Sequence, residues 1–184
     1  LLAAGTGTRL RPMTDSAPKC LTVIGGETIL GRLVRNLREQ GITKLIVVVG
    51  YMEESIRYFL RDNAPGLMIK YVVNADYSTT NNIYSLWLAR QQIQEPFLLL
   101  ESDVVFDASM LRGLLKSDKI AISNLQPWMN GTTVTLNNKK IRSFHVGADT
   151  RQGQHFKTVN FYSLSLPTWY KVLEGLNRYI TDKQ

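Results

Sequence analysis

The chain has 184 residues, of which 44% are hydrophobic and 20% are charged, a composition typical of one globular domain with a real core. No apolar run approaches the ~18 residues of a membrane span, and the single cysteine, Cys20, excludes an internal disulfide and favours a reducing compartment, the cytoplasm. The net charge of +7 would suit nucleic acid or an anionic small molecule. Because the Lys and Arg residues are scattered, we expect a small phosphorylated substrate, and neither nucleic acid nor a membrane, as partner.

The chain opens with the apolar residues LLAA, which predict a buried strand, and continues into a loop with glycines, prolines and several cations. Apolar side chains at helical spacing predict a helix over residues 28–41, with Thr28 as its N-cap and Gly41 as its stop. The β-branched run over residues 44–50 is typical of a strand buried on both faces. Beyond it, the same patterns predict helices over 53–62, 81–93 and 109–117, and strands over 67–74, 96–106 and 119–125.

Strands and helices that alternate at this spacing predict a single α/β domain over residues 1–184, with a doubly wound, mostly parallel sheet. Residues 131–146 break this pattern, because short alternating stretches flank an Asn-Asn turn and predict an antiparallel hairpin late in the chain. In open α/β sheets, ligands bind beyond the carboxyl ends of the strands. We expect the opening loop, Tyr51, Asn74 and residues 101–103 to converge there.

The opening loop is the first candidate site, because Gly5 and Gly7 let the backbone approach a ligand and present N–H groups to phosphate oxygens. Arg9 adds a planar fork of donors, and Lys19 adds a compact positive charge. The loop is neither a G-x-G-x-x-G dinucleotide motif nor a P-loop, since it lacks the third glycine and the GK[ST] ending. What remains is L-A-A-G-x-G-x-R-L-x-P-x-[ST], then P-K-x-L, in order over residues 2–21.

This stretch resembles the motif of the nucleotidyltransferases that join an NTP to a phosphorylated small molecule and release pyrophosphate. That family includes sugar-1-phosphate nucleotidylyltransferases and bacterial phosphocholine cytidylyltransferases, and the resemblance implies their Rossmann-like fold. It also implies that Arg9 holds the triphosphate and that Lys19 bridges the α-phosphate and the acceptor phosphate. The residues that we assign to nucleotide binding are Ala3, Ala4, Gly5, Thr6, Gly7, Tyr51, Asn74 and Ser85.

The second candidate site is an acid at the end of a buried strand, Asp103 in LLLESDVVF. Its carboxylate would suit a Mg²⁺ ion that bridges phosphates, and the resemblance implies the same role, with Arg9, Lys19 and Asp103 as the catalytic set. A structural alternative is that Asp103 caps the following helix or pairs with Arg9 or Lys19. Glu101 and Ser102 precede Asp103, whereas many sugar enzymes have glycine and aspartate here, which points away from a sugar substrate.

Three later stretches, NADYSTTNNIYSLWLAR, QPWMNGTTV and FKTVNFYSLS, resemble segments of phosphocholine and phosphonate cytidylyltransferases. An ammonium group binds well to aromatic faces, so Tyr84, Trp128 and Tyr162 are candidates for an amine pocket. Core packing explains Tyr84 nearly as well, whereas Trp128 lies in a loop and is harder to explain as core. The residues that we assign to acceptor binding are Asn82, Tyr84, Trp128, Lys157 and Asn160.

The expected reaction is transfer of a cytidylyl group from CTP to a phosphorylated amino alcohol or an aminoalkylphosphonate, with Mg²⁺ as cofactor. The loop alone also permits a sugar-1-phosphate nucleotidylyltransferase, and a non-catalytic nucleotide-binding domain is a third possibility. His145 and His155 are far apart in the sequence and lack metal-ligand spacing, so we expect neither to be catalytic.

Members of the resembled family usually hold Mg²⁺ with a second aspartate, in a Trp-x-Glu-Ile-Asp-Thr stretch that this sequence does not contain. Asp149 lies in a turn-like sequence, and Asp182 follows a helical run among polar residues, as a surface residue would. We therefore expect the chain to be truncated, at its start as well as its end, because it opens within a strand.

Overall fold

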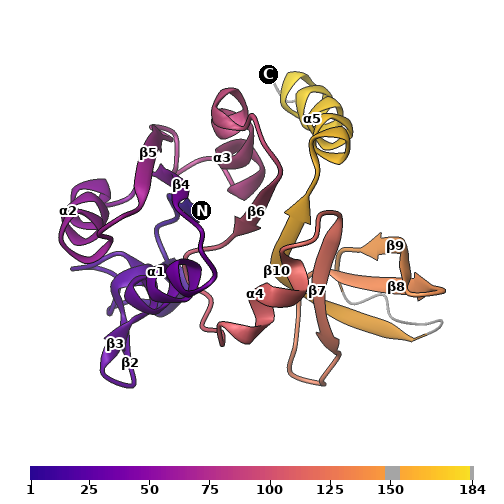
Figure 1. The fold of residues 1–184 in the computed structure, drawn as a ribbon, viewed down its shortest axis with the longest axis horizontal. Coiled ribbons are helices and arrows are strands. Elements are labelled where there is room, and N and C mark those ends of the chain that lie inside the picture. Colours follow the sequence, from indigo (N-terminus) through magenta and orange to yellow (C-terminus); the bar gives the residue numbers. More distant parts are fainter. Residues whose placement is uncertain (148–153, 183–184) are drawn as a thin grey trace.

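The computed structural model describes residues 1–147 and 154–182, which form a mixed α/β architecture (Figure 1). Its α-helices are α1 (Ile29–Glu39), α2 (Glu53–Asn63), α3 (Asn82–Leu88), α4 (Ser109–Leu114) and α5 (Leu166–Thr181), and its 3-10 turns are η1 (Thr8–Leu10), η2 (Lys19–Leu21) and η3 (Ala89–Gln92). Its strands are β1 (Leu2–Ala3), β2 (Val23–Ile24), β3 (Glu27–Thr28), β4 (Lys44–Val49), β5 (Met68–Val73), β6 (Phe97–Leu100), β7 (Lys119–Asn124), β8 (Thr133–Asn137), β9 (Lys140–His145) and β10 (His155–Leu164).

The strands form a parallel sheet and an antiparallel sheet that meet side by side, and β2 and β3 form a separate two-stranded antiparallel sheet. The parallel sheet has the order β1-β4-β5. The antiparallel sheet has the order β6-β10-β8-β9, and β7 also pairs with β10. A parallel bridge between Leu2 and Glu101 joins the two sheets, and the Ser102 N–H donates to the Leu2 carbonyl at 3.0 Å. The end of β6 is thereby fixed beside β1 and the loop that follows β1.

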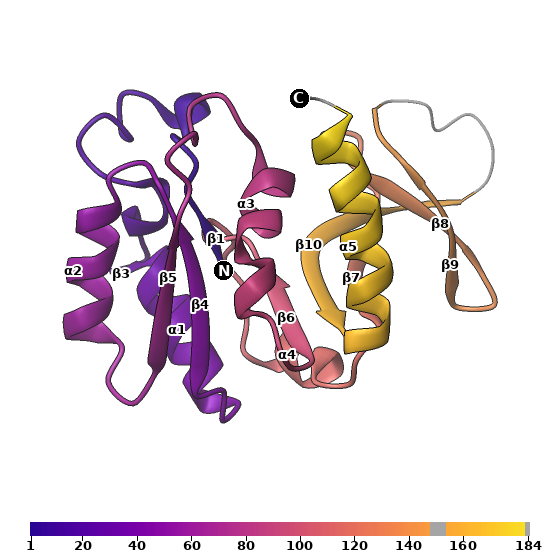
Figure 2. The ribbon, with the colours of Figure 1, turned by 90° about the horizontal axis from the view of Figure 1, so that it is seen from above.

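Helices cover both faces of this assembly, as Figures 1 and 2 show. On one face, α1, α2 and α4 pack over a core that includes Leu33, Leu111 and Phe161, each no more than 1% exposed. On the other face, α3 and α5 cover a second core, in which the buried Trp169 meets the ring of Phe97 edge-on at 5.3 Å between centroids. The doubly wound α/β class predicted from the sequence is confirmed.

Local sequence signals explain several element ends. The Thr28 hydroxyl accepts the Gly31 N–H at 3.0 Å and caps α1, and Gly41 follows the helix with a φ of 73°. The predicted late hairpin is present as β8 and β9, with Asn138 and Lys139 at φ values of 48° and 63° in its turn. A two-residue turn with both φ angles positive matches the twist of the flanking strands, which favours this hairpin.

Three elements are shorter than their apolar patterns predicted, and one of them is the helix expected over residues 109–117, which ends as α4 at Leu114. The strand expected over residues 96–106 ends at Leu100, because the backbone beyond it turns to bond β1 through Ser102. It also pairs antiparallel with β10, and its backbone meets the parallel sheet where β6 ends, at the Leu2–Glu101 bridge. The helix expected over residues 81–93 ends as α3 at Leu88 and tightens into the 3-10 turn η3, a common form for the last turn of a helix.

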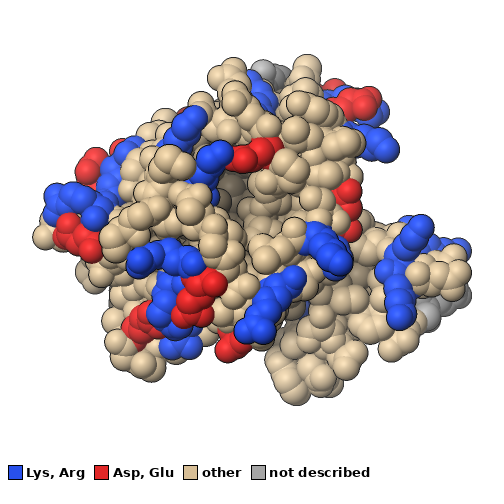
Figure 3. Space-filling model, viewed as in Figure 1, with Lys and Arg blue, Asp and Glu red and all other residues tan. Residues whose placement is uncertain are grey.

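The surface agrees with the scattered charge of the sequence. On the face drawn in Figure 3, Lys and Arg side chains lie over several elements and are interspersed with Asp and Glu. None of the helices in the described part of the chain is both long enough and apolar enough to cross a membrane.

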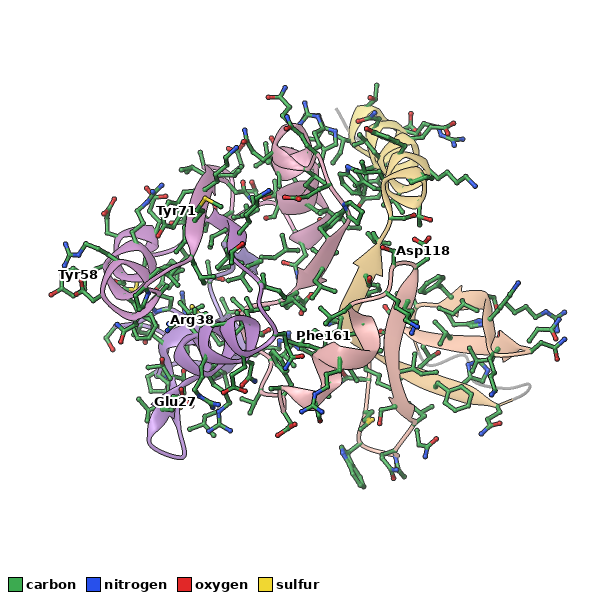
Figure 4. The ribbon with its side chains drawn as sticks, viewed as in Figure 1. Glu27, Arg38, Tyr58, Tyr71, Asp118 and Phe161 are labelled. Carbon is green, nitrogen blue, oxygen red and sulfur yellow. The ribbon has the colours of Figure 1, made fainter. Side chains whose placement is uncertain are left out.

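We expect Phe161→Ala to lower the free energy of unfolding by about 3–5 kcal/mol, because it empties the centre of the first core. Phe161 is 1% exposed, it projects from β10 toward the side that α1 and α4 cover (Figure 4), and its ring meets that of Phe106 at 4.7 Å. Urea unfolding measures the loss. The matched control is Phe144→Ala at a side chain that is 55% exposed, where a change within about 0.5 kcal/mol is expected. Equal losses at both positions would contradict this account of the core.

Candidate active site

The opening loop is held in one conformation by its neighbours. Gly7 adopts a φ of 65°, and a Cβ atom at this position would lie 3.0 Å from the Thr14 side chain, so only glycine fits. The buried Thr14 hydroxyl donates to the Gly7 carbonyl at 3.0 Å. Tyr51 fixes both ends, since its N–H donates to the Ala4 carbonyl at 3.1 Å and its hydroxyl to the Thr14 carbonyl at 2.9 Å. Tyr51, which was predicted to contact the nucleotide, therefore stabilises the loop by these two hydrogen bonds.

The outer part of the loop is open. Ala3 and Ala4 are buried where β1 ends, whereas Gly5 is exposed and a Cβ atom there would meet nothing within 4 Å. Arg9, in η1, is exposed and forms no ion pair with any described residue. The loop thus offers backbone and a guanidinium to an external ligand. In Figure 2, it lies at the same end of the molecule as the segment that leads into α3.

The clearest juxtaposition in the site is the ion pair between Lys19 and Asp103, which are 84 residues apart in the sequence. Lys19 opens η2 and Asp103 follows β6, and the Lys19 ammonium donates to Asp103 Oδ2. Both side chains are a little under a third exposed, so a ligand can reach them. Pairing with Lys19 was one of the structural alternatives for Asp103, and it leaves the second carboxylate oxygen, Oδ1, outside the pair.

Asn74 and Ser85, predicted to bind the nucleotide, face inward. Asn74 is 1% exposed, and its side-chain N–H₂ donates to the hydroxyls of Ser85 and Thr80, both at 3.0 Å. Its side-chain oxygen accepts the Asp76 N–H at 3.1 Å. Both the N–H₂ group and the oxygen of the Asn74 side chain are thus bonded within the protein. Asn74 and Ser85 therefore stabilise the segment between β5 and α3.

Glu101 was expected at this edge of the sheet, but no binding role was assigned to it from the sequence. Its Oε1 accepts the side-chain amide of Asn82 at 2.6 Å, and its Oε2 accepts that of Asn160 at 3.0 Å. Asn82 and Asn160, both assigned to acceptor binding, therefore converge from α3 and β10 on the residue that ends β6. The available signal was an acid two residues before Asp103, at the end of the same apolar run.

The aromatic residues assigned to the acceptor do not form a closed cage. Tyr84 stacks on Trp87 with 5.7 Å between ring centroids and 28° between planes, which favours the packing explanation for Tyr84. Trp128 is 77% exposed in the loop between β7 and β8. Tyr162 is partly buried, and its hydroxyl lies 3.5 Å from the side-chain oxygen of Asn160.

Lys157, the remaining acceptor candidate, is bound by backbone carbonyls. Its ammonium donates to the carbonyl oxygens of Thr158 at 2.8 Å and of Thr132 at 3.3 Å. It therefore ties β10 to the loop that precedes β8.

The two histidines are closer than the sequence suggested. Their rings lie 4.9 Å apart between centroids, because β9 and β10 flank β8 and both rings reach over it. Within the described residues, no three His, Cys, Asp or Glu side chains gather as metal ligands. Asp182 is exposed beyond the end of α5, as predicted for a surface residue, and Asp149 lies outside the described residues.

An apolar cavity of about 430 Å³ lies elsewhere, at the amino ends of the strands. Thr43, Lys44 and Pro96, at the starts of β4 and β6, line it, and it includes none of the predicted site residues. The candidate site is therefore the more open, charged region at the carboxyl ends.

Comparison with known proteins places this architecture in a family. Residues 1–130 match the MobA-like NTP transferase domain. The chain is 35% identical over 173 residues to a CMP-5'-(3-aminopropyl)phosphonate synthase of Streptomyces rubellomurinus, covering 89% of this chain and 27% of that protein. It is 26% identical over 178 residues to a choline-phosphate cytidylyltransferase of Streptococcus pneumoniae, covering 97% of this chain and 74% of that protein.

The comparisons also include a sugar enzyme and a solved structure. A UTP–glucose-1-phosphate uridylyltransferase of Haloferax volcanii is 36% identical over 110 residues, covering 60% of this chain and 44% of that protein. The structure of the CTP:phosphocholine cytidylyltransferase of Streptococcus pneumoniae superposes with a TM-score of 0.76 at 22% identity. That likeness covers 100% of this chain and 77% of the other, and it shows the nucleotidyltransferase fold.

Cys20 should be chemically inert in the folded protein. Its thiol is 2% exposed, and burial raises its pKa from the ordinary 9.0 to about 12. At pH 8, we expect a disulfide reagent to label it about a thousandfold more slowly in the native state than in urea, because the thiolate is that much rarer. Absorbance of the released thiol measures both rates.

The raised pKa of Cys20 also makes the stability of the folded protein depend on pH. The contribution of the neutral thiol is fully present below pH 9 and is lost as pH rises toward about 12. Native labelling within tenfold of the unfolded rate at pH 8 would show that Cys20 is accessible and that this burial is wrong.

Proposed function

Because the chain belongs to the MobA-like NTP transferase domain family, we propose that it is the catalytic domain of a cytidylyltransferase. Its acceptor would be a small phosphonate or phosphate ester that carries an amine, and the products would be the CMP conjugate and pyrophosphate. The observation that carries this proposal is the meeting of Lys19 and Asp103 beside the open glycine loop. It supplies a cation for phosphate and a carboxylate for a metal at one place.

The relatives support the choice of CTP and of an amine-bearing acceptor. Two of them are named for CMP or cytidylyl transfer, one to an aminopropylphosphonate and one to choline phosphate. The chain spans about a quarter of the length of the first and about three quarters of the second. The activity, the substrates and a cytoplasmic location, where a lone thiol stays reduced, are all parts of this proposal.

In the proposed reaction, an oxygen of the acceptor phosphonate or phosphate attacks the α-phosphorus of CTP, and the bond to pyrophosphate breaks. The acceptor oxygen is already anionic, so the chain needs no side-chain nucleophile. Its contribution is to position the reactants and to stabilise negative charge. The exposed backbone around Gly5, Thr6 and Gly7 and the guanidinium of Arg9 would hold the triphosphate, and Lys19 would neutralise charge between the two reacting phosphorus groups.

The described residues fit a bound Mg²⁺ ion in one respect. Mg²⁺ is usually held by one or two carboxylates together with phosphate oxygens and water, and Asp103 offers a reachable carboxylate with Oδ1 outside its pair with Lys19. Asp103 would therefore hold the ion, which when bound would neutralise charge on the phosphates.

A sugar-1-phosphate nucleotidylyltransferase is the second candidate, favoured by the 36% identity to the uridylyltransferase. A pyrophosphate-release assay on the full-length protein separates the candidates, by crossing CTP, UTP, GTP and TTP with 2-aminoethylphosphonate, phosphocholine and glucose-1-phosphate. We expect product with CTP and an amine acceptor, and its loss when EDTA removes divalent metal. Turnover with glucose-1-phosphate and with neither amine acceptor would establish the sugar enzyme. If no combination of NTP and acceptor releases pyrophosphate, the result would support a non-catalytic domain.

We expect Lys19→Ala to lower kcat by roughly 10²–10³-fold, because it removes a preorganised cation where charge develops. The matched control is Lys44→Ala, since Lys44 also forms an ion pair, with Glu95, but both side chains are about 60% exposed at the opposite end of the sheet. That variant should stay within about twofold of the wild-type kcat. Urea unfolding of both variants separates a catalytic loss from a folding loss, and a Lys19→Ala enzyme with normal kcat would refute the assignment.

A further inference from the structure

Glu101 has a charge that its surroundings do not neutralise. Both carboxylate oxygens accept hydrogen bonds, but the donors are the neutral amides of Asn82 and Asn160. Across residues 1–147 and 154–182, no Lys, Arg or His forms an ion pair with Glu101. Because Glu101 is partly buried, its carboxylate is partly withdrawn from water without a counter-ion from the described chain.

A partly buried carboxylate without a counter-ion has a free-energy cost, and a cation on a bound ligand would remove it. The contrast with Asp103 is informative, because that acid lies two residues further on and has its cation, Lys19. A carboxylate can accept about four hydrogen bonds, and the two amides use two of them. The remaining acceptor positions of Glu101 suit N–H donors that the chain itself does not provide.

The backbone around Asn160 departs from regular structure to reach Glu101. Asn160 adopts a φ of 59°, and the register of β10 against β7 shifts between Thr158 and Tyr162. A positive φ is unfavourable for most residues, but asparagine tolerates it better than others. At this irregularity, the side-chain N–H₂ group of Asn160 donates to the Glu101 carboxylate at 3.0 Å. The strained residue thus holds the unpaired acid in position.

The same region is poorly suited to a quaternary ammonium group. Such a group has no N–H to donate and depends on aromatic faces for its binding. Trp128 is 77% exposed and Tyr84 already stacks on Trp87, so of the three candidate aromatic residues Tyr162 alone lies close to Glu101. A primary ammonium has three N–H donors, which hydrogen bond strongly to a carboxylate.

We propose that Glu101, held by Asn82 and Asn160, binds the primary ammonium group of the acceptor and makes the enzyme select primary amines over quaternary ones. This inference rests on the proposed function and names the class of acceptor within it. Lys19 and Asp103 would then face the phosphorus end of the acceptor, and Glu101 would face its amine end.

The test is steady-state kinetics with three phosphonates that differ only at the amine end: 2-aminoethylphosphonate, its N,N,N-trimethyl derivative and ethylphosphonate. For the wild type, we expect kcat/KM to be at least tenfold higher for the primary amine than for either of the others. Glu101→Gln should lower kcat/KM for 2-aminoethylphosphonate by about 10–100-fold, because it removes a charged hydrogen-bond acceptor. It should change the value for ethylphosphonate by less than about threefold. Glu95→Gln, at an exposed acid paired with Lys44, is the matched control and should change neither.

A second variant guards against misfolding at Glu101. Asn82→Ala removes one of the two amides from an exposed position at the start of α3, and it should reduce only the reaction of the amine acceptor, by about 3–10-fold. Equal losses for 2-aminoethylphosphonate and ethylphosphonate would make Glu101 a structural residue. Equal wild-type use of the primary and trimethyl acceptors would also overturn the inference, while leaving the cytidylyltransferase intact. Absence of product with every amine acceptor would overturn the proposed function and this inference together.

Discussion

The parallel bridge between Leu2 and Glu101 determines where the candidate site forms. In the part of the chain that the structure describes, it is the β-bridge that joins the parallel sheet to the antiparallel one. The Ser102 N–H also donates to the Leu2 carbonyl, so the chain turns as soon as β6 ends. Glu101 and Asp103 consequently emerge beside the glycine loop. Both cores support this join, since Leu100 packs in one and Leu2 in the other.

The site that results has two acids in opposite electrostatic environments. Asp103 is paired with Lys19, and the neighbouring glycine loop adds the guanidinium of Arg9, which pairs with no described residue, so that half of the site carries a net positive charge. Glu101 accepts hydrogen bonds from two neutral amides and forms no ion pair with a described residue. Because electrostatic interactions strengthen as water is excluded, a substrate with an anionic and a cationic end would complement the two halves in one orientation. The contrast between Asp103 and Glu101, two residues apart, is therefore consistent with the proposed zwitterionic acceptor.

Local patterns predicted most of the fold, because they depend on neighbours in the sequence. The capping hydroxyl of Thr28, the β-branched run of β4 and the hairpin turn at Asn138 each produced the predicted element. The apolar run from residue 96 misled because hydrophobicity marks burial and does not mark where a strand changes partner. The residues of the candidate site also divide into those that a local sequence pattern predicts and those that only a long-range contact reveals. Lys19 and Asp103 lie in recognisable stretches, whereas the role of Glu101 depends on a long-range contact with Asn160 that no single stretch contains.

The conformation of Asn160 shows why the part of the candidate site around Glu101 depends on tertiary contacts. A residue held at positive φ has a cost of order 1–3 kcal/mol, which the surrounding structure must offset. Here the hydrogen bond from the Asn160 amide is to a charged acceptor, which is roughly twice as strong as a bond between neutral groups. This hydrogen bond therefore offsets part of the cost of the positive φ at Asn160. A cation bound at Glu101, as proposed above, would leave this bond in place and neutralise the charge, so the bulge at Asn160 is compatible with that proposal.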